Sequence, residues 1–475
     1  MSDSNNKDDW LADFNLTNAF SPDGEGEKNN NTPEPTKSLS PEGTKTSTSP
    51  DLLERNPFES LQSTDNTSSS SKKDTISDSP FNSRPNEKKK DKKSKPSMKA
   101  DEVSVMAVEE KKDIDIKLKQ LDEFSTYILD LDIPGLKKEY VNEIATIIPK
   151  PDEIKAFLKF QALRKNRNFT APCYDHSRVI LKEAATEDTY VNASYVNTLD
   201  GKKRYICAQA PLDNTVADFW RMIIQENVEV VVMLCEFVEG SKKKCSEYIP
   251  LVVGKSICFD DMAVHLIKRE ILKKDNNVAV NHLSVKRGKK EIVIRHYTWK
   301  SWPKVGCPSV SSTAMYIYAA TYKSKYPILV HCASGIRRSP IFILISMFMD
   351  CVSETKIENG ILLKLAKHVR LARAGALTSE IDYIYVARVL LQRFLDRKLI
   401  TPSQKMLEFF DDYDPALRRA QRSESEKKTE MTVGPMPVLP VNEKGEIIYN
   451  KEDLQNASEN RSKSKTRSRD NKKTK

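Results

Sequence analysis

The sequence lacks any apolar run long enough to cross a bilayer. The longest runs, such as 340–349, fall well short of the roughly 20 residues that a spanning helix needs. None of the eight cysteines stands in a C-x-x-C pair, so neither a zinc site nor a disulfide framework is indicated. Residues 1–9 are polar and acidic, unlike a secretory signal. These absences predict a cytoplasmic protein, with the cell cortex or nucleus also open, and no cofactor or metal is expected.

Apolar residues are also scarce, at 38% of the chain, and they are unevenly spread. Residues 1–115 are rich in Ser, Thr and Lys and are predicted to be disordered, because they cannot bury enough apolar surface to fold. Residues 116–400 are predicted to form one folded domain. Residues 401–475 are predicted to be a mostly disordered basic tail, in which 406–422 extends a helix and disorder begins at Ser423.

The two ends carry candidate contacts for partners. Lys and Arg clusters at 88–99 and 461–469 contribute much of the net charge of +10. The first predicts a nuclear import signal or contact with an anionic membrane, and the second predicts contact with RNA, a membrane or an import receptor. A plain solvated tail is the alternative for both clusters. The N-terminal region also contains minimal sites for proline-directed kinases, where phosphate would add charge to a flexible arm. These sites are Ser21, Thr32, Ser40, Ser49 and Ser79.

One stretch organises the folded domain. An apolar β-type run ends in His331-Cys332, a short loop follows, and Arg338-Ser339-Pro340 opens an apolar helical run. Such a strand–loop–helix unit points backbone N–H groups at one spot and so forms an anion cradle. The same field favours a cysteine thiolate, and Arg338 supplies a two-pronged donor for phosphate oxygens. The residues expected to surround the phosphate are Ala333, Ser334, Gly335, Ile336, Arg337 and Arg338.

The apolar patterns around this unit predict a mixed α/β fold. Alternating or continuous apolar runs predict strands at 190–196, 204–211, 229–235, 244–250, 258–268, 281–285, 290–297 and 326–332. Helical spacing predicts helices at 114–140, 153–163, 215–226, 310–323, 353–374 and 380–398, with a break in the first at 133–135.

Further motifs precede the cysteine loop, and together they resemble the classical, phosphotyrosine-specific non-receptor protein tyrosine phosphatases. The resemblance covers residues 120 to 400 and implies the family's α/β fold, a highly twisted mixed sheet flanked by helices. Dual-specificity and lipid phosphatases are shorter or lack the early motifs. The motifs are Lys165-Asn166-Arg167, Asp175-His176-Ser177-Arg178-Val179, Asn192-Ala193-Ser194, Gln209-Ala210-Pro211, Phe219-Trp220-Arg221-Met222 and Trp302-Pro303.

The resemblance implies roles for the residues of the cysteine loop. Cys332 matches the family nucleophile, which attacks phosphorus to give a cysteinyl-phosphate. Arg338 matches the phosphate clamp, and Ser339 matches the hydroxyl that helps the cysteinyl group depart. His331 is expected to orient the loop, and Glu239 is expected to pair with Arg338.

Other family positions carry different residues. The family's general acid, the aspartate of Trp-Pro-Asp, is Lys304, which is a poor proton donor at pH 7 and cannot act as a base when protonated. A second group of substitutions affects water positioning and recognition of the substrate ring. These positions are Thr378 and Asp382 in place of two glutamines, Asn168 in place of a tyrosine, and Thr170 in place of an aspartate. Arg337 replaces a glycine of the cradle, where it is expected to add positive charge and to strain the loop if positive φ is required there.

Loss of general acid–base catalysis typically lowers the rate by about 10²–10⁴-fold, or roughly 3–5 kcal/mol of barrier. The sequence therefore predicts an impaired enzyme, a pseudophosphatase that binds a phosphorylated or acidic protein as a regulator or scaffold. The alternative is a slow but active tyrosine phosphatase that recruits its acid from Asp382 or Glu380. A third reading uses the domain only as a platform for active tails.

Overall fold

The structure is a computed structural model that describes residues 100–182, 188–300, 302–303 and 305–430. The predicted disordered N-terminal region, with its kinase sites, lies outside the described residues apart from its last part, and so does the basic end of the C-terminal tail. Among the described residues, no helix is both long enough and apolar enough to span a bilayer.

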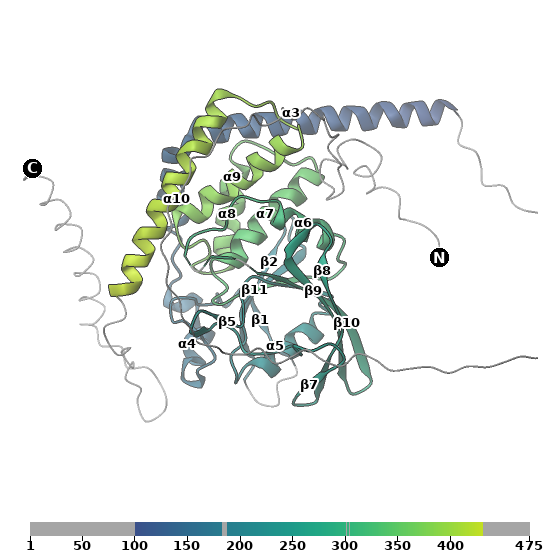
Figure 1. The fold of residues 1–475 in the computed structure, drawn as a ribbon, viewed down its shortest axis with the longest axis vertical. Coiled ribbons are helices and arrows are strands. Elements are labelled where there is room, and N and C mark those ends of the chain that lie inside the picture. Colours follow the sequence, from purple (N-terminus) through teal and green to yellow (C-terminus); the bar gives the residue numbers. More distant parts are fainter. Residues whose placement is uncertain (1–99, 183–187, 301, 304, 431–475) are drawn as a thin grey trace, which may run out of the picture. The chain divides into compact units, whose positions relative to one another are not determined.

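Nine strands of the described chain form one mixed sheet, in the order β1-β2-β3-β11-β4-β10-β9-β8-β7 (Figure 1). The central strands β3, β11, β4 and β10 run parallel, and the outer pairs are antiparallel. The strands are β1 Arg178–Ile180, β2 Tyr190–Asn197, β3 Lys203–Gln209, β4 Val230–Met233, β7 Ser256–Phe259, β8 Met262–Leu272, β9 Asp275–Arg287, β10 Lys290–Trp299 and β11 Ile328–Cys332. A separate hairpin pairs β5 Val238–Glu239 with β6 Lys242–Lys243. Every residue of β11 is buried, because strands flank it on both sides and helices cover the sheet.

Helices lie on both faces of the sheet and bury two apolar cores. One face carries α5, and the other carries α6, α7, α8 and α9, with α3 and α10 packed outside them (Figure 1). The helices are α3 Ala100–Glu139, α4 Lys155–Lys159, α5 Val216–Gln225, α6 Thr313–Thr321, α7 Arg338–Ser353, α8 Ile361–Ala372, α9 Glu380–Asp396 and α10 Gln404–Glu430. Short 3₁₀ turns at Pro151–Glu153 and Gln161–Leu163 and a π-turn at Tyr140–Ile144 complete the helical segments. The predicted fold, a twisted mixed sheet flanked by helices, is confirmed.

Four predicted elements differ in the structure. The predicted helix 153–163 is the five-residue α4 with a 3₁₀ turn on either side. Residues 244–250 form no strand. Their backbone groups bond to other segments instead; for example, the Trp220 indole N–H of α5 donates to Tyr248 O at 3.0 Å. The run 258–268 is two strands, β7 and β8, joined by a turn in which Asp260 has a φ of 51°. The predicted helix 353–374 is the end of α7 and a separate α8, which begins after Gly360 at a φ of 76°.

The two ends of the domain are helical. The predicted break in the first helix falls at Asp132, which has non-helical angles, two residues before Pro134. At the other end, α10 continues to Glu430, so the prediction of disorder from Ser423 is wrong for residues 423–430. The helix is fixed to the domain because Met406, Phe409 and Tyr413 are each only 1% exposed within the larger core.

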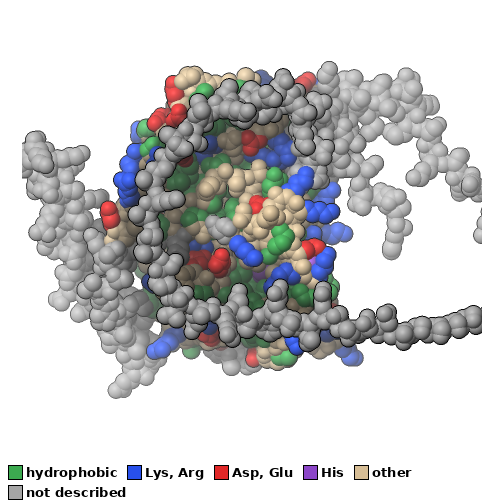
Figure 2. Space-filling model, viewed as in Figure 1, with side chains coloured by type: hydrophobic (Ala, Val, Ile, Leu, Met, Phe, Trp, Pro, Cys, Tyr) green, Lys and Arg blue, Asp and Glu red, His purple; other side chains and the backbone are tan. Residues whose placement is uncertain are grey.

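Surface charge is unevenly distributed. On the face seen in Figure 2, Lys and Arg side chains lie along both the left-hand and the right-hand margins, with Asp and Glu side chains among them. The folded domain therefore presents positive charge on part of its surface.

Candidate functional site

The loop between β11 and α7 turns its carbonyl groups away from Cys332. The carbonyls of residues 332–337 all accept hydrogen bonds from donors outside the cradle. The donors, in order, are Ala210 N for residues 332 and 333, the Arg373 side chain for 334 and 335, Leu377 N for 336 and Ile341 N for 337. With the carbonyls engaged outside, the loop N–H groups are left for the interior, and Gly335 N donates to Cys332 Sγ at 3.2 Å. This is the geometry of an anion-binding nest.

Gly335 is required by this geometry. Its φ is 69°, a backbone conformation that residues with a Cβ rarely adopt. A Cβ at this position would also lie 2.5 Å from the carbonyl carbon of Ala208 and 2.8 Å from Gln209 N, both backbone atoms of the neighbouring β3. The loop therefore packs against β3 without room for a side chain.

Arg373, which the sequence did not identify as a functional residue, holds the loop. It is fully buried and donates to Ser334 O at 3.2 Å and to Gly335 O at 3.1 Å. It also donates to Asn192 Oδ1 at 2.6 Å, to Cys173 Sγ at 2.7 Å and to Ser194 Oγ at 3.4 Å. In the sequence, Arg373 is one of several basic residues in or just after the 361–372 helix, so local pattern does not single it out.

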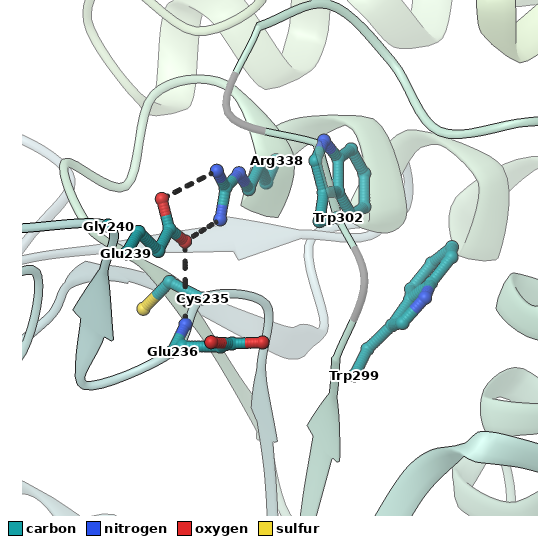
Figure 3. Close-up of a pocket in the computed structure, with 7 residues that line it drawn as sticks. All are labelled: Cys235, Glu236, Glu239, Gly240, Trp299, Trp302 and Arg338. Carbon is teal, nitrogen blue, oxygen red and sulfur yellow. Dashed lines mark hydrogen bonds and ion pairs between the residues drawn. The ribbon is translucent and has the colours of Figure 1, made fainter. Parts of the chain in front are cut away.

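Arg338 is held at the start of α7 by the pairing that the sequence predicted. The Glu239 carboxylate accepts hydrogen bonds from both terminal nitrogens of Arg338 (Figure 3). Nη2 lies 3.0 Å from Oε2, and Nη1 is bonded to Oε1. Nη1 also donates to Leu234 O at 3.0 Å, and Nη2 donates to Pro303 O at 3.2 Å. Four protein acceptors therefore occupy the four terminal N–H groups of this arginine.

A pocket of about 120 Å³ lies beside Arg338. Figure 3 shows Trp302 next to the guanidinium and Glu239 on its other side. Trp299 and Trp302 contact each other with ring centroids 4.9 Å apart. The lining residues are Cys235, Glu236, Glu239, Gly240, Trp299, Trp302 and Arg338.

Arg337 behaves differently from the sequence prediction. Its φ is −121°, so it adopts no positive φ, and the expected strain is absent at this residue. Its charge is also compensated: Nε donates to Asp382 Oδ1 at 2.9 Å, and Nη1 donates to Glu424 Oε2 at 2.6 Å. Burial alone would lower the pKa of Arg337, but the two adjacent carboxylates outweigh it and raise that pKa.

Asp382 caps a helix. Its side chain is 0% exposed and its Oδ2 accepts from Thr378 N and Thr378 Oγ1, both at 2.9 Å, and from Ser379 N at 3.2 Å. With Ser379 it forms the capping box of α9. Glu380 points elsewhere, since its carboxylate lies 3.4 Å from Lys137 Nζ of α3. Both carboxylates that could replace the missing acid are therefore engaged in other contacts.

The remaining predicted residues are distributed around the cradle. Asn168 and Thr170 are exposed on one turn, closed by a bond from Ala171 N to Asn168 O at 3.3 Å. This turn is near the loop, because a Cβ on Gly375 would lie 3.5 Å from Thr170 O. Ser339 is fully buried, and its hydroxyl has no hydrogen-bond partner among the described residues. Lys304 lies outside the described residues.

His331 belongs to a buried polar chain behind the loop. Tyr248 Oη lies 2.6 Å from His331 Nε2 and 2.6 Å from His296 Nε2. Burial lowers the pKa of His296 to about 3 and that of His331 well below its usual value. Both imidazoles are therefore neutral at pH 7, and Tyr248 links them by donating to one ring and accepting from the other.

Comparison with known proteins agrees with the geometry. The family model described as Protein-tyrosine phosphatase matches residues 162–392. Tyrosine phosphatase-like protein J1 of Microplitis demolitor bracovirus (isolate Webb) is 30% identical over 274 residues, covering 54% of this chain and 89% of that protein. The chain belongs to the protein-tyrosine phosphatase family. The resemblance to this family, inferred from the motifs, is thereby confirmed.

Other relatives include both receptor-type and non-receptor tyrosine phosphatases. Tyrosine-protein phosphatase non-receptor type 5 of Homo sapiens is 31% identical over 240 residues, covering 48% of this chain and 41% of that protein. The catalytic domain of human protein tyrosine phosphatase non-receptor type 18 has the same fold, with a TM-score of 0.51 at 24% identity over 56% of this chain and 96% of that one. The chain spans less than half the length of several relatives, and only 11% of the human receptor-type phosphatase zeta.

Proposed function

We propose that this chain is a catalytically impaired phosphatase that binds a phosphate group on a protein partner and acts as a regulator or scaffold in signalling. The observation that carries the proposal is the cradle at Cys332. Six consecutive carbonyls face outward, and Gly335 N lies 3.2 Å from the thiol sulfur. A phosphate dianion bound there would meet backbone N–H groups and the start of α7.

The site has no suitable residue at the position of the family's general acid. The family's acid position is Lys304 in the sequence, and a lysine ammonium is a poor proton donor at pH 7. Asp382 is buried and accepts bonds from Arg337, Thr378 and Ser379, so supplying a proton would break the cap of α9. With no acid or base in place, the reaction is expected to be slower by about 10²–10⁴-fold.

A slow phosphatase is the second candidate. It is favoured by the same thiol, since Cys332 accepts from Gly335 N as an attacking thiolate would, and by the unpartnered hydroxyl of Ser339. Hydrolysis would pass through a cysteinyl-phosphate. The P–O bond to tyrosine breaks as the S–P bond forms, and water then releases phosphate and restores the thiol.

The proposed partner is a phosphorylated or acidic protein in the cytoplasm, at the cell cortex or in the nucleus. The Lys and Arg side chains on the surface of the domain could contact such a partner (Figure 2). We also propose that the basic tails contact an anionic membrane or nucleic acid. Kinases would phosphorylate the Ser/Thr-Pro sites of the N-terminal region.

The test compares wild type, Cys332→Ser and Lys304→Asp on one phosphotyrosyl peptide, with hydrolysis and binding measured on each protein. We expect wild type to bind the peptide but to turn over orders of magnitude below about 1 s⁻¹, the low end of typical enzymes. A wild-type kcat of about 1 s⁻¹ or more that disappears in Cys332→Ser would contradict the proposal.

Lys304→Asp identifies the defect. If the missing acid dominates, hydrolysis by this variant should rise by about tenfold or more. An unchanged rate would assign the block to Asn168, Arg337 or Thr378 instead.

A further inference from the structure

Helix α10 reaches the phosphate loop from a firmly anchored start. Its first three turns bury Met406, Phe409 and Tyr413 in the core. In Figure 1 the helix runs past α9, and the two helices are in contact. Phe410 lies under Arg388 of α9, whose guanidinium carbon is 3.4 Å from the ring centroid. Beyond Pro415, the side chains of Ala416, Leu417 and Ala420 also pack against the core, so the later turns are held on the domain as well.

The later turns of α10 make direct contacts beside the cradle. Glu424 accepts from Arg337 Nη1 at 2.6 Å and from Gly306 N at 3.3 Å. Its side chain is 29% exposed, so the ion pair with the 17% exposed Arg337 is partly shielded from solvent. Gln421 packs directly on Gly306, since a Cβ there would lie 2.6 Å from Gln421 Cγ. One helical turn therefore binds both the phosphate loop and a residue shortly after the Trp302-Pro303 motif.

These contacts bear on phosphate binding because the Pro303 carbonyl accepts a hydrogen bond from Arg338, the residue expected to bind phosphate. The four terminal N–H groups of Arg338 are taken by Glu239, Leu234 O and Pro303 O. A bidentate bond to phosphate needs two N–H groups on one edge of the guanidinium. Glu239 holds the edge between the two terminal nitrogens, so a phosphate approaching the Nε–Nη2 edge competes with Pro303 O at Nη2. Phosphate binding and the observed position of Pro303 are therefore opposed.

We propose that the Gln421–Glu424 turn of α10 is an intramolecular brake on phosphate binding. It rests on the proposed function, because it regulates the same site. Glu424 and Gln421 hold Gly306, three residues after Pro303, and thereby favour the arrangement in which Pro303 O satisfies Arg338. Glu424 also places a carboxylate next to the loop, where it neutralises Arg337 and opposes an incoming anion. Release of this turn frees Arg337 Nη1 and lets Pro303 O leave Arg338 Nη2, so both nitrogens can meet an anionic partner.

Glu424→Gln tests the brake in the full chain. Glutamine keeps the size of the side chain but loses the ion pair, while Arg337 keeps its bond to Asp382. Glu426→Gln is the matched control, since it removes the same charge from an exposed position two residues further on. The probes are a phosphotyrosyl peptide and inorganic phosphate, titrated calorimetrically. We expect Glu424→Gln to bind both probes about two- to tenfold more tightly than wild type, and Glu426→Gln to match wild type.

The outcomes separate the brake from the proposed function. If wild type binds and Glu424→Gln binds no more tightly than Glu426→Gln, the brake is overturned and the phosphate site stands. If neither wild type nor Glu424→Gln binds either probe, the phosphate-binding function is overturned, and the brake with it. An unchanged melting temperature in Glu424→Gln establishes that any gain in affinity comes from a folded site.

Discussion

Replacing Asp382 with asparagine decides whether this carboxylate is structural or catalytic. In the structure Asp382 is 0% exposed and accepts bonds from Arg337 Nε, Thr378 N, Thr378 Oγ1 and Ser379 N. An asparagine has only one acceptor oxygen. Its NH₂ group would therefore face either Arg337 Nε or the N–H groups of Thr378 and Ser379, which are also donors. The buried ion pair with Arg337 would also lose its negative partner.

The size of the effect follows from these contacts. Breaking a buried ion pair by removing one partner typically costs about 3–5 kcal/mol, a range that includes the smaller loss of a helix cap. Arg337 keeps Glu424, which favours the lower end of that range. At about 2–4 °C per kcal/mol for a domain of this size, the melting temperature should fall by roughly 6–20 °C.

The assay is thermal unfolding of Asp382→Asn and of Glu380→Gln, with residual phosphatase activity measured below both transitions. Glu380 is the matched control because it lies in the same helical turn and contacts only Lys137 among the ion pairs described, at 3.4 Å. Its loss should change stability by less than about 0.5 kcal/mol. An Asp382→Asn protein with the wild-type melting temperature but no residual activity would refute the structural role and restore Asp382 as a catalytic acid.

Two further perturbations test the cradle and the buried chain behind it. Gly335→Ala places a Cβ 2.5 Å from the Ala208 carbonyl carbon at a φ of 69°, so it should abolish phosphate binding in calorimetry, and binding at wild-type affinity would show that the loop can rearrange. The lowered pKa values of His296, at about 3, and of His331 mean that the unfolded chain takes up protons first as the pH falls below about 6.5. Stability is therefore complete above about pH 6.5 and is lost toward pH 3, by up to about 1.4 kcal/mol per pH unit for each histidine. Urea unfolding midpoints that are equal at pH 7 and pH 5 would contradict this.

The sequence determined the phosphate loop because its structure is local. An apolar strand ending at Cys332, a glycine at 335 and a helix opened by Arg338 lie within a few residues of one another, so pattern and spacing predict strand, cradle and helix together. The pairing of Arg338 with Glu239 was also predicted, but from the family resemblance, since 99 residues separate the two. Local patterns failed at 244–250, where buried residues pack under α5 instead of joining a strand ladder.

Tertiary structure alone decided what Arg337 does. From the sequence it was an extra charge on a strained loop, whereas in the fold it binds Asp382, 45 residues away, and Glu424, 87 residues away. The same holds for Arg373, whose side chain turns two loop carbonyls outward, and for α10, which was expected to end before Glu424. Each role depends on contacts between segments far apart in the chain. Such contacts are fixed by the packing of helices on the sheet, and local periodicity carries no information about them.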